Sequence, residues 1–471
     1  MTKRSSAFEP ALNAAVEKAL SFLESLDDAA VGATVDAATL RARLLRPLDD
    51  GPMDAARVIE DLARDVEGGI LGMPGGRFFA WGIGGSLPAA LAADWLTSAW
   101  DQNAALYACG PAASIVEEAV GLWLKDLLYI PQSASFALVT GCQMAHVTCL
   151  AAARHSLLAR RGWDIEQHGL YGAPHIRFIS STNRHGSIDR AIRLLGLGAE
   201  NVEYLEPKED ESLDEQALRR ALQSIGDKPT IVLLQAGDIN TGVFDSFGSV
   251  IPMAKEHGAW VHVDGAFGLW VAASPRHRHV LKGADAADSW ATDGHKWLNV
   301  PFDCGYAFVA DADSHRASMS MRAPYIAGQL NARDQIDWNP EWSRRARGFP
   351  SYAALRELGR DGIADLIDSS CQFARELVDG IGALEGAEVL WYPVINQGLV
   401  RFRATHADAS ESDHDLRTME VIDSVVRRGQ AYFGPTTWRG KRAMRISVLN
   451  WQTSENDVSR AINAVARALL D

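Results

Sequence analysis

The chain has 471 residues, of which 47% are hydrophobic and 23% charged, and its formal net charge is −14. This length exceeds one typical core, so more than one domain is expected, and the negative charge argues against nucleic acid or an anionic membrane surface as the main partner. The five cysteines show no metal or redox spacing, and no signal peptide or apolar run of roughly 18 residues is visible. We therefore expect a cytoplasmic protein that does not enter a membrane.

The N-terminal region predicts helices that have no core of their own. Residues 8–28 carry apolar side chains at helical spacing, and Asp54 is placed to cap a second helix that runs to about Glu67. We expect these helices to pack on another surface, such as a second subunit. The glycine-rich stretch that follows, residues 68–86, lacks the preceding strand and the later acidic residue of a dinucleotide loop. Its aromatic residues favour a pocket wall over a plain loop.

Helices are predicted next at 88–100 and from Pro111 to about Leu128, and the pattern then changes. From residue 134 onward, short apolar runs alternate with helical segments, which predicts a mostly parallel sheet covered on both faces. The predicted strands are 136–140, 176–180, 202–205, 230–234, 260–263, 289–292 and 305–309. Ligands of such sheets bind beyond the carboxyl ends of the strands.

Residues 312–350 are predicted to form a long irregular connection that contains Tyr325 and Trp338; a connection of this length is usually functional or disordered. A helix predicted over 351–380 then leads into strands and helices that are typical of a compact α+β domain. The expected division is an N-terminal helical segment, a large cofactor-binding domain and a small C-terminal domain, at 1–75, 76–345 and 346–471.

Two residues in the alternating region favour a particular chemistry. Asp264 ends an apolar strand and is followed by small residues, and Lys296 follows a later strand about thirty residues on. Alone, Lys296 beside Trp297 is equally typical of a surface cation that lies on an aromatic face. Together, an amine and a strand-end carboxylate are what an enzyme needs to hold pyridoxal phosphate (PLP), through an imine and a protonated pyridine nitrogen.

Two further loops fit the same cofactor. Gly141, Cys142 and Gln143 form a strand-to-helix turn, where backbone N–H groups at a helix start can bind phosphate; the alternative is an ordinary connecting turn. His185 lies in a polar loop after a strand, placed either to stack on a pyridine ring or to face solvent.

The loop after the strand at 230–234 supplies Asn240, a candidate donor to the phenolic oxygen of the cofactor, with Thr241 beside it and Asp245 to order the turn. Plain turn chemistry explains these residues equally well. His277 and His279 fit a solvated loop, and no metal site is expected.

In this order, the motifs resemble those of the PLP-dependent fold-type I enzymes, and more narrowly the group II amino acid decarboxylases, which include the aromatic L-amino acid and glutamate decarboxylases. The matching segments are 78–81, 110–117, 261–267 and 295–304, and the resemblance covers nearly the whole chain. It implies an aspartate aminotransferase-like α/β fold, with a mostly parallel seven-stranded sheet and a smaller α+β domain. It also implies PLP, an amino acid substrate and a homodimer with its active site between the subunits.

By this resemblance, Lys296 forms the Schiff base and Asp264 pairs with the pyridine nitrogen. His185 stacks on one ring face and the methyl group of Ala266 packs on the other. The implied reaction is loss of the α-carboxylate from an L-amino acid through a quinonoid intermediate.

The remaining cofactor contacts follow from the same resemblance. Cys142 and Gln143 take the phosphate, with Thr292 beside them, and His295 lies near the substrate or the phosphate. The phosphate turn departs from the small, hydroxyl-bearing pattern of the family, and His146 replaces a common Asn or Thr.

Phe79, Trp81, Trp338 and Arg445 are the candidate substrate contacts, although Arg445 also fits a structural ion pair. Trp338 aligns near the loop Tyr that donates a proton in the aromatic decarboxylases, and indole has no acidic proton for that task. Either another residue, such as His185, acts there, or the enzyme performs other PLP chemistry: aldehyde formation, carbon–carbon lysis or transamination. Three arginines are expected to form interdomain or intersubunit ion pairs: Arg344, Arg345 and Arg347.

Overall fold

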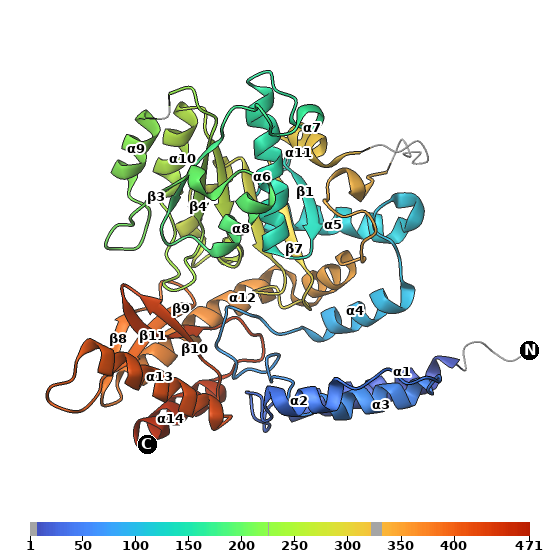
Figure 1. Ribbon diagram of the computed structural model, residues 1–471, viewed down its shortest axis with the longest axis vertical. Coiled ribbons are helices and arrows are strands. Elements are labelled where there is room, and N and C mark those ends of the chain that lie inside the picture. Colours follow the sequence, from blue (N-terminus) through green and yellow to red (C-terminus); the bar gives the residue numbers. More distant parts are fainter. Residues whose placement is uncertain (1–6, 225, 322–331) are drawn as a thin grey trace, which may run out of the picture.

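The computed structural model describes residues 7–224, 226–321 and 332–471 (Figure 1). Two separate sheets organise the chain, one with seven strands and one with four. The seven strands of the first sheet are β1 (Ser135–Val139), β2 (Arg177–Ser181), β3 (Val202–Leu205), β4 (Thr230–Gln235), β5 (Trp260–Asp264), β6 (Ser289–Asp293) and β7 (Gly305–Val309).

The seven-stranded sheet has the order β1-β7-β6-β5-β4-β2-β3. Neighbouring strands from β6 through β5, β4 and β2 to β3 are parallel, whereas β7 runs antiparallel to both β6 and β1. The predicted mostly parallel sheet is therefore confirmed, and each predicted strand lies within two residues of its observed bounds.

Apolar side chains on alternate positions build one core on each face of this sheet. In β4, Ile231 and Leu233 pack on one face while Val232 and Leu234 pack on the other. Each fully buried aliphatic side chain contributes about 1.5–3 kcal/mol relative to exposure. One face is covered by α6 (Cys142–Ala159), α8 (Gly186–Leu194) and α11 (Ala312–Met319), and the other by α5 (Pro111–Leu127), α9 (Glu215–Gln223) and α10 (Phe247–Glu256).

The carboxyl ends of the central strands bring distant residues together. Gln235 at the end of β4 pairs with Asp264 at the end of β5, and Asp264 pairs in turn with Ala291 of β6. Helix α6 begins beside these ends, because the Cys142 amide donates to Asp293. The strand ends and the start of α6 therefore define one edge at which a ligand can be held.

The N-terminal helices lie beside the main body rather than within it (Figure 1). Helices α1 (Glu9–Ser25) and α3 (Ala55–Asp65) pack on each other, and Asp54 caps α3 as predicted, accepting from two backbone amides at 3.1 Å. A short helix between them, α2 (Ala37–Leu44), was not predicted. Several apolar side chains of α1 and α3 remain exposed: Leu12, Val16, Leu20, Val58 and Leu62.

The C-terminal part is an antiparallel four-stranded sheet of order β10-β11-β9-β8 with two helices. Its elements are β8 (Ala387–Trp391), β9 (Gln397–Phe402), α13 (Glu411–Arg427), β10 (Gly434–Trp438), β11 (Lys441–Ser447) and α14 (Glu455–Leu469). The prediction omitted β10, which contains Pro435 and lies at the sheet edge, where proline is tolerated.

Helix α12 (Gly348–Gly382) connects the two parts and leaves helical geometry at Gly359, where φ is 61°. It contacts α4 (Pro88–Trp100) and α5 on the large-sheet side, and α14 and β9 on the small-sheet side. No helix among the described residues has the length and apolar character required to cross a bilayer.

Candidate active site

Lys296 lies in the turn after β6 and is the amine of the site. Its side chain is 14% exposed, and Nζ lies 3.7 Å from Oδ2 of Asp293 and 5.7 Å from the ring centre of Phe267. At 3.7 Å the ion pair is loose, so Nζ is held near the carboxylate without being fixed on it. No short hydrogen bond to Asp293 therefore fixes the position of Nζ.

The glycine-rich loop is the wall behind Lys296. The Gly84 amide donates to the His295 carbonyl oxygen at 3.2 Å, and the Gly85 amide donates to Asn299 at 2.8 Å. A Cβ atom on Gly84 would lie 2.0 Å from the Lys296 carbonyl oxygen, so only glycine permits this approach. The predicted role of this stretch as a wall therefore has a physical basis: it supports the backbone that carries the amine.

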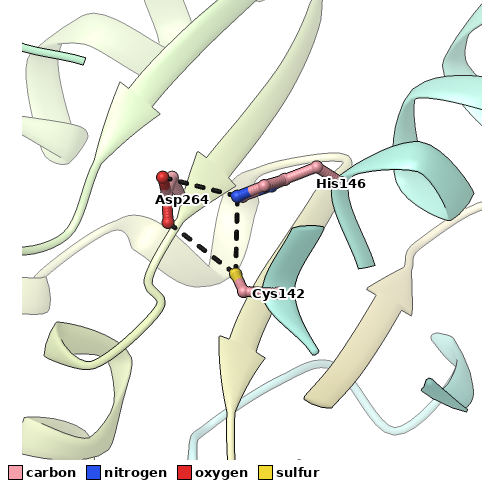
Figure 2. Close-up of side chains that lie close together, drawn as sticks. All are labelled: Cys142, His146 and Asp264. Atoms are coloured by element: carbon pink, nitrogen blue, oxygen red, sulfur yellow. Dashed lines mark hydrogen bonds and ion pairs between the residues drawn. The ribbon is translucent and has the colours of Figure 1, made fainter. Parts of the chain in front are cut away.

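Asp264 ends β5, and three groups converge on its carboxylate, of which Figure 2 shows His146 and Cys142. The Ala266 amide donates to Oδ1 at 3.1 Å, His146 Nε2 lies 3.5 Å from Oδ2, and Cys142 Sγ lies 3.9 Å from Oδ1. Burial alone would raise the pKa of Asp264, but the nearby His146, His185 and Lys296 outweigh it and hold the pKa well below its usual range. The carboxylate is therefore ionised at neutral pH.

His185 stands at the start of α8 with an exposed side chain. Its Nδ1 accepts the Ser187 amide at 3.3 Å, which leaves the proton on Nε2 when the ring is neutral. Surrounding protein lowers the pKa of His185 by removing water from the charged form, and the charges of Asp264, Lys296 and Arg445 also act on it. His185 is thus near enough to Asp264 and Lys296 for their charges to act on it.

The contacts at the start of α6 correct the prediction that Cys142 takes the phosphate. The Cys142 amide donates to Oδ1 of Asp293 at 2.6 Å, so it is already satisfied by a carboxylate of this chain. The Gln143 amide has no acceptor among the described residues and stays available at the helix start. A Cβ atom on Gly141 would lie 3.5 Å from the same Asp293 oxygen. Gln143, rather than Cys142, therefore offers the free backbone donor.

The contacts of Thr292 give no support to its predicted place beside the phosphate. This residue is fully buried, and its hydroxyl donates to the Ala266 carbonyl oxygen at 3.3 Å. Side chains alternate along β6, and the next residue, Asp293, faces the start of α6 instead. His295 is held by its Nδ1–H, which donates to the Cys304 carbonyl oxygen at 3.1 Å.

The loop after β4 is tied to neighbouring elements. Asn240 Oδ1 accepts the Thr436 hydroxyl of β10 at 2.8 Å, and Thr241 donates to Asp238 within its own turn at 2.8 Å. Asp245 accepts the Gln235 amide at 2.7 Å and so orders the turn, as predicted. The role of Asn240 toward a cofactor stays a prediction.

The predicted substrate contacts separate into two groups. Phe79 is fully buried and stacks on Phe433 in the core of the C-terminal part, so its prediction as a substrate contact is wrong. Trp81 is 45% exposed and packs against Tyr432 at the edge of the glycine-rich loop. Arg445 has a buried Nε without a hydrogen-bond partner among the described residues, and its charge reaches His185. Trp81 and Arg445 stay candidates.

The contacts of Trp338 also bear on its prediction. Its indole packs against Arg333 and lies edge-on to His315 of α11, and its carbonyl oxygen accepts His315 Nε2 at 2.9 Å. Trp338 packs against the buried apolar cluster that includes side chains of α6. Among the described residues it makes no contact with Lys296. These contacts give no support to a role of Trp338 in place of the loop Tyr, and that role stays a prediction. Tyr325 lies outside the described residues.

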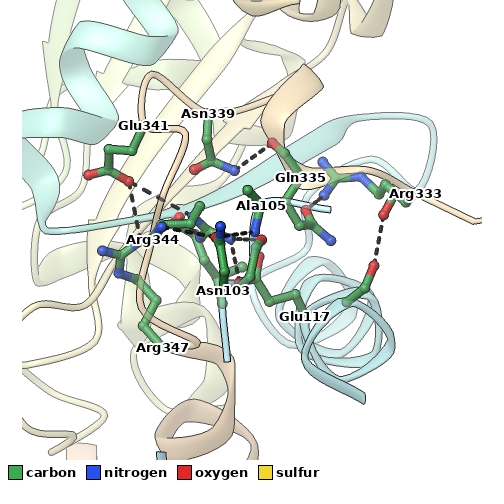
Figure 3. Close-up of polar contacts among 12 residues, drawn as sticks. Asn103, Ala105, Glu117, Arg333, Gln335, Asn339, Glu341, Arg344 and Arg347 are labelled. Atoms are coloured by element: carbon green, nitrogen blue, oxygen red, sulfur yellow. Dashed lines mark hydrogen bonds and ion pairs between the residues drawn. The ribbon is translucent and has the colours of Figure 1, made fainter. Parts of the chain in front are cut away.

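The three arginines after Trp338 form pairs within this chain, and Figure 3 shows the pairs of Arg344 and Arg347. Arg344 is fully buried and contacts Glu117 of α5 at 2.6 Å, and Arg347 lies 3.2 Å from Glu341. Arg345 pairs with Asp94 of α4 at 2.6 Å. The expected ion pairs are present, but Arg344 and Arg345 pair within residues 76–345 rather than between domains or subunits.

The residues of this site fit PLP. The Asp264 carboxylate is buried, ionised and followed by the small residue Ala266, as a pyridine nitrogen requires. Lys296 Nζ is loosely held, and the Gln143 amide at the start of α6 has no acceptor in the described part of the chain. Amine, ring carboxylate and anion donor thus converge on one edge of the sheet.

Two residues of the site were not among the predicted contacts. Asp293 joins the amide of Cys142 to the Lys296 turn, and its place three residues before Lys296 was a signal that sequence reasoning did not use. His146 lies one helical turn after Cys142, so that both side chains face Asp264. The i, i+4 spacing was visible in the sequence, but the partner across the sheet was not.

Comparison with known proteins gives a consistent result. Residues 40–405 match the model of the pyridoxal-dependent decarboxylase conserved domain. The aromatic-L-amino-acid decarboxylase of Bacillus atrophaeus is 25% identical over 452 residues, covering 94% of this chain and 92% of that protein. The phenylacetaldehyde synthase of Petunia hybrida is 23% identical over 445 residues, covering 89% of this chain and 87% of that protein.

Among solved structures, the crystal structure of Oryza sativa TDC with PLP and tryptamine superposes with a TM-score of 0.92. It is 24% identical in sequence and covers 100% of this chain and 99% of that chain. This likeness supports the fold described above.

Proposed function

Since this chain belongs to the pyridoxal-dependent decarboxylase family, we propose that it removes the α-carboxylate of an L-amino acid, with Lys296 as the residue that holds PLP covalently. The protein is a PLP-dependent carboxy-lyase of fold type I. The observation that carries the proposal is the set of contacts that joins the buried carboxylate of Asp264 to Lys296: Asp264 contacts Cys142, the Cys142 amide donates to Asp293, and Asp293 lies 3.7 Å from Lys296 Nζ. The charges of His185 and Lys296 also act on Asp264.

Bound PLP supplies an electron sink for the bond that breaks at Cα. Asp264 would hold the pyridine nitrogen protonated through a charge-assisted hydrogen bond, which its lowered pKa makes possible at neutral pH. The Gln143 amide and the positive end of α6 would hold the phosphate. Gly84 supports the backbone of Lys296 and so keeps Nζ at this site.

His185 is the group we place at the reacting carbon. Its Nδ1 accepts the Ser187 amide at 3.3 Å, so the neutral ring carries its proton on Nε2. Loss of carbon dioxide leaves an electron pair on Cα. The doubly protonated ring of His185 can deliver the proton from Nε2 that replaces the carboxylate, and the neutral ring that remains keeps its proton on Nδ1, 2.7 Å from the Ser187 hydroxyl. The contacts of Trp338 with Arg333 and His315 give no reason to prefer aldehyde formation over decarboxylation.

The side chain of the substrate is proposed to be aromatic. Trp81 is half-exposed three residues before Gly84, which touches the Lys296 carbonyl oxygen. Relatives of this chain carry the names aromatic-L-amino-acid decarboxylase and tryptophan decarboxylase. An indole or phenol ring of a substrate would stack against such a residue.

We also propose a cytoplasmic homodimer. The exposed apolar side chains on α1 and α3, such as Leu12, Leu20 and Leu62, form a surface that a second copy would cover. Sedimentation should give twice the chain mass, and replacement of Leu12 and Leu20 by Asp should shift the protein toward a monomer. A monomeric unchanged protein at working concentration contradicts the dimer.

The test of the reaction is a panel of L-amino acids incubated with the PLP-loaded protein. Carbon dioxide, amine, aldehyde and keto acid are assayed together, with oxygen consumption. We expect carbon dioxide and amine in equal amounts, without oxygen uptake, and the best rates with Trp, Tyr or Phe. Aldehyde with ammonia and oxygen consumption would assign aldehyde-forming chemistry instead, since relatives named phenylacetaldehyde synthase also match this chain.

A further inference from the structure

A buried chain of polar side chains runs from Asp264 into the sheet, and the proposed reaction does not use it. His146 Nε2 lies 3.5 Å from Asp264 and 3.4 Å from Cys142 Sγ. The other ring nitrogen of His146 lies 2.9 Å from Nε2 of His262, and Nδ1 of His262 lies 2.9 Å from the Ser289 hydroxyl. His146, His262 and Ser289 are fully buried, so water does not replace any of these contacts.

We propose that His146 is a positioning residue that presents a protonated Nε2 to Asp264 and so keeps this carboxylate charged and correctly oriented. The inference rests on the proposed function only in taking Asp264 as the group that faces the pyridine nitrogen. His262 and Ser289 hold the His146 ring in place from behind.

The chemistry of the neighbours decides where the proton lies. An ionised carboxylate only accepts hydrogen bonds. If Nε2 of His146 carried no proton, its lone pair would face the Asp264 oxygen in a site without water, which is unfavourable. Burial raises the pKa of the Cys142 thiol well above its ordinary value, so this neighbour stays neutral and carries no charge that competes for the proton.

The far end of the chain is compatible with this assignment. Burial lowers the pKa of His262 to about 3, so His262 is neutral and has one donor and one acceptor nitrogen. The Trp260 indole N–H donates to the Ser289 oxygen at 2.9 Å, and Ser289 can still donate to or accept from His262. His146 with a proton on Nε2 therefore has hydrogen-bond partners for both ring nitrogens, whether the ring is neutral or doubly protonated.

The same geometry defines a competing possibility. Ligand atoms of Cys142, His146 and Asp264 lie within 4.8 Å of one another, a spacing that a divalent metal ion could bridge (Figure 2). A metal ion would bind the lone pair of a deprotonated Nε2. The proposed role and a metal site thus exclude each other at this nitrogen.

The first test is nuclear magnetic resonance of the cofactor-free protein labelled with ¹⁵N-histidine, in which His146 is assigned by the signals that disappear in His146→Asn. We expect Nε2 of His146 to be protonated. An unprotonated Nε2 overturns the proposal, and so does a zinc titration that yields one tightly bound ion in the unchanged protein and none in His146→Asn. Neither measurement depends on the reaction catalysed.

The second test compares PLP dissociation constants, measured by fluorescence. His146→Leu should weaken PLP binding about tenfold to a hundredfold, because a hydrogen bond to a charged group is lost, and His146→Asn should restore most of it through its amide N–H. The matched control is His315→Leu, which removes another fully buried histidine that contacts Ser135 and Trp338 instead. The role assigned to His146 is contradicted if PLP binding weakens equally in His146→Leu, His146→Asn and His315→Leu. It is also contradicted if His146→Leu binds PLP as tightly as the unchanged protein.

Discussion

The backbone amide of Cys142 donates to the carboxylate of Asp293 at 2.6 Å, which fastens the start of α6 to the turn that carries Lys296. These residues are 151 positions apart in the chain. The contact places a negative charge of the protein beside the helix start at which we place the cofactor phosphate. Asp293 therefore fixes the geometry of the proposed phosphate site, and its negative charge repels the negative charge of the phosphate.

Asp293→Asn separates these two effects. The Asn carbonyl oxygen can still accept the Cys142 amide, but the negative charge is gone. We expect PLP to bind more tightly by about 1 kcal/mol, roughly fivefold, whereas pyridoxal, which has no phosphate, gains nothing. The two dissociation constants are measured in parallel for both proteins. An unchanged ratio of the pyridoxal and PLP constants would show that the phosphate does not lie near Asp293.

The buried ion pair of Glu117 and Arg344 predicts a large loss of stability. Both side chains are fully buried, and the pair distance is 2.6 Å. Glu117→Gln leaves the arginine charge without its counter-ion and should lower the free energy of unfolding by about 3–5 kcal/mol. Urea denaturation of the cofactor-free protein measures the change.

The matched control for this pair lies on the surface. Asp126 pairs with Arg360, and both side chains are more than half exposed. Asp126→Asn should change the free energy of unfolding by less than about 0.5 kcal/mol. Similar losses in the two variants would contradict the structural role assigned to the buried pair.

His315 predicts a sensitivity to acid. Burial lowers its pKa to about 3, whereas the unfolded chain has the ordinary value of 6.5. The unfolded state therefore binds more protons between these values, and the stability that is present above pH 6.5 is lost as the pH falls toward 3. Between pH 7 and pH 5 this loss is about 2 kcal/mol for one such histidine.

The variant His315→Gln checks this sign. Glutamine does not titrate, so the difference in unfolding free energy between pH 7 and pH 5 should shrink by about 2 kcal/mol relative to the unchanged protein. Denaturation curves at both pH values give this difference directly. If the variant loses as much stability on acidification as the unchanged chain, His315 is not held neutral in the folded state.

The seven-stranded sheet was predictable because its strands are short apolar runs between helical segments, as in 230–234. Asp264 and Lys296 were predictable for the same reason, since each follows a strand end. Residues 312–350 were not predictable in this way: α11 is short and polar, so nothing marked it as a helix that contacts Trp338 through His315.

The remaining errors arose from single-residue details that a sequence does not carry. Side chains along β6 alternate between the two faces of the sheet, so Asp293 faces α6 and Thr292 does not. A shift of the strand by one position would exchange these two orientations. The partner of the Cys142 amide lies on another strand, and the burial of Phe79 depends on Phe433 of the C-terminal part. Each depends on a contact between distant segments, which local pattern does not specify.

The most direct test of the account is to locate the attachment of PLP. The loaded protein is reduced with borohydride, digested, and its peptides are identified by mass spectrometry, with Lys296→Ala and Lys255→Ala treated in parallel. We expect the cofactor on the peptide that contains Lys296 in the unchanged protein and in Lys255→Ala, and no attachment in Lys296→Ala. Attachment to a different lysine in the unchanged protein would contradict the site described here.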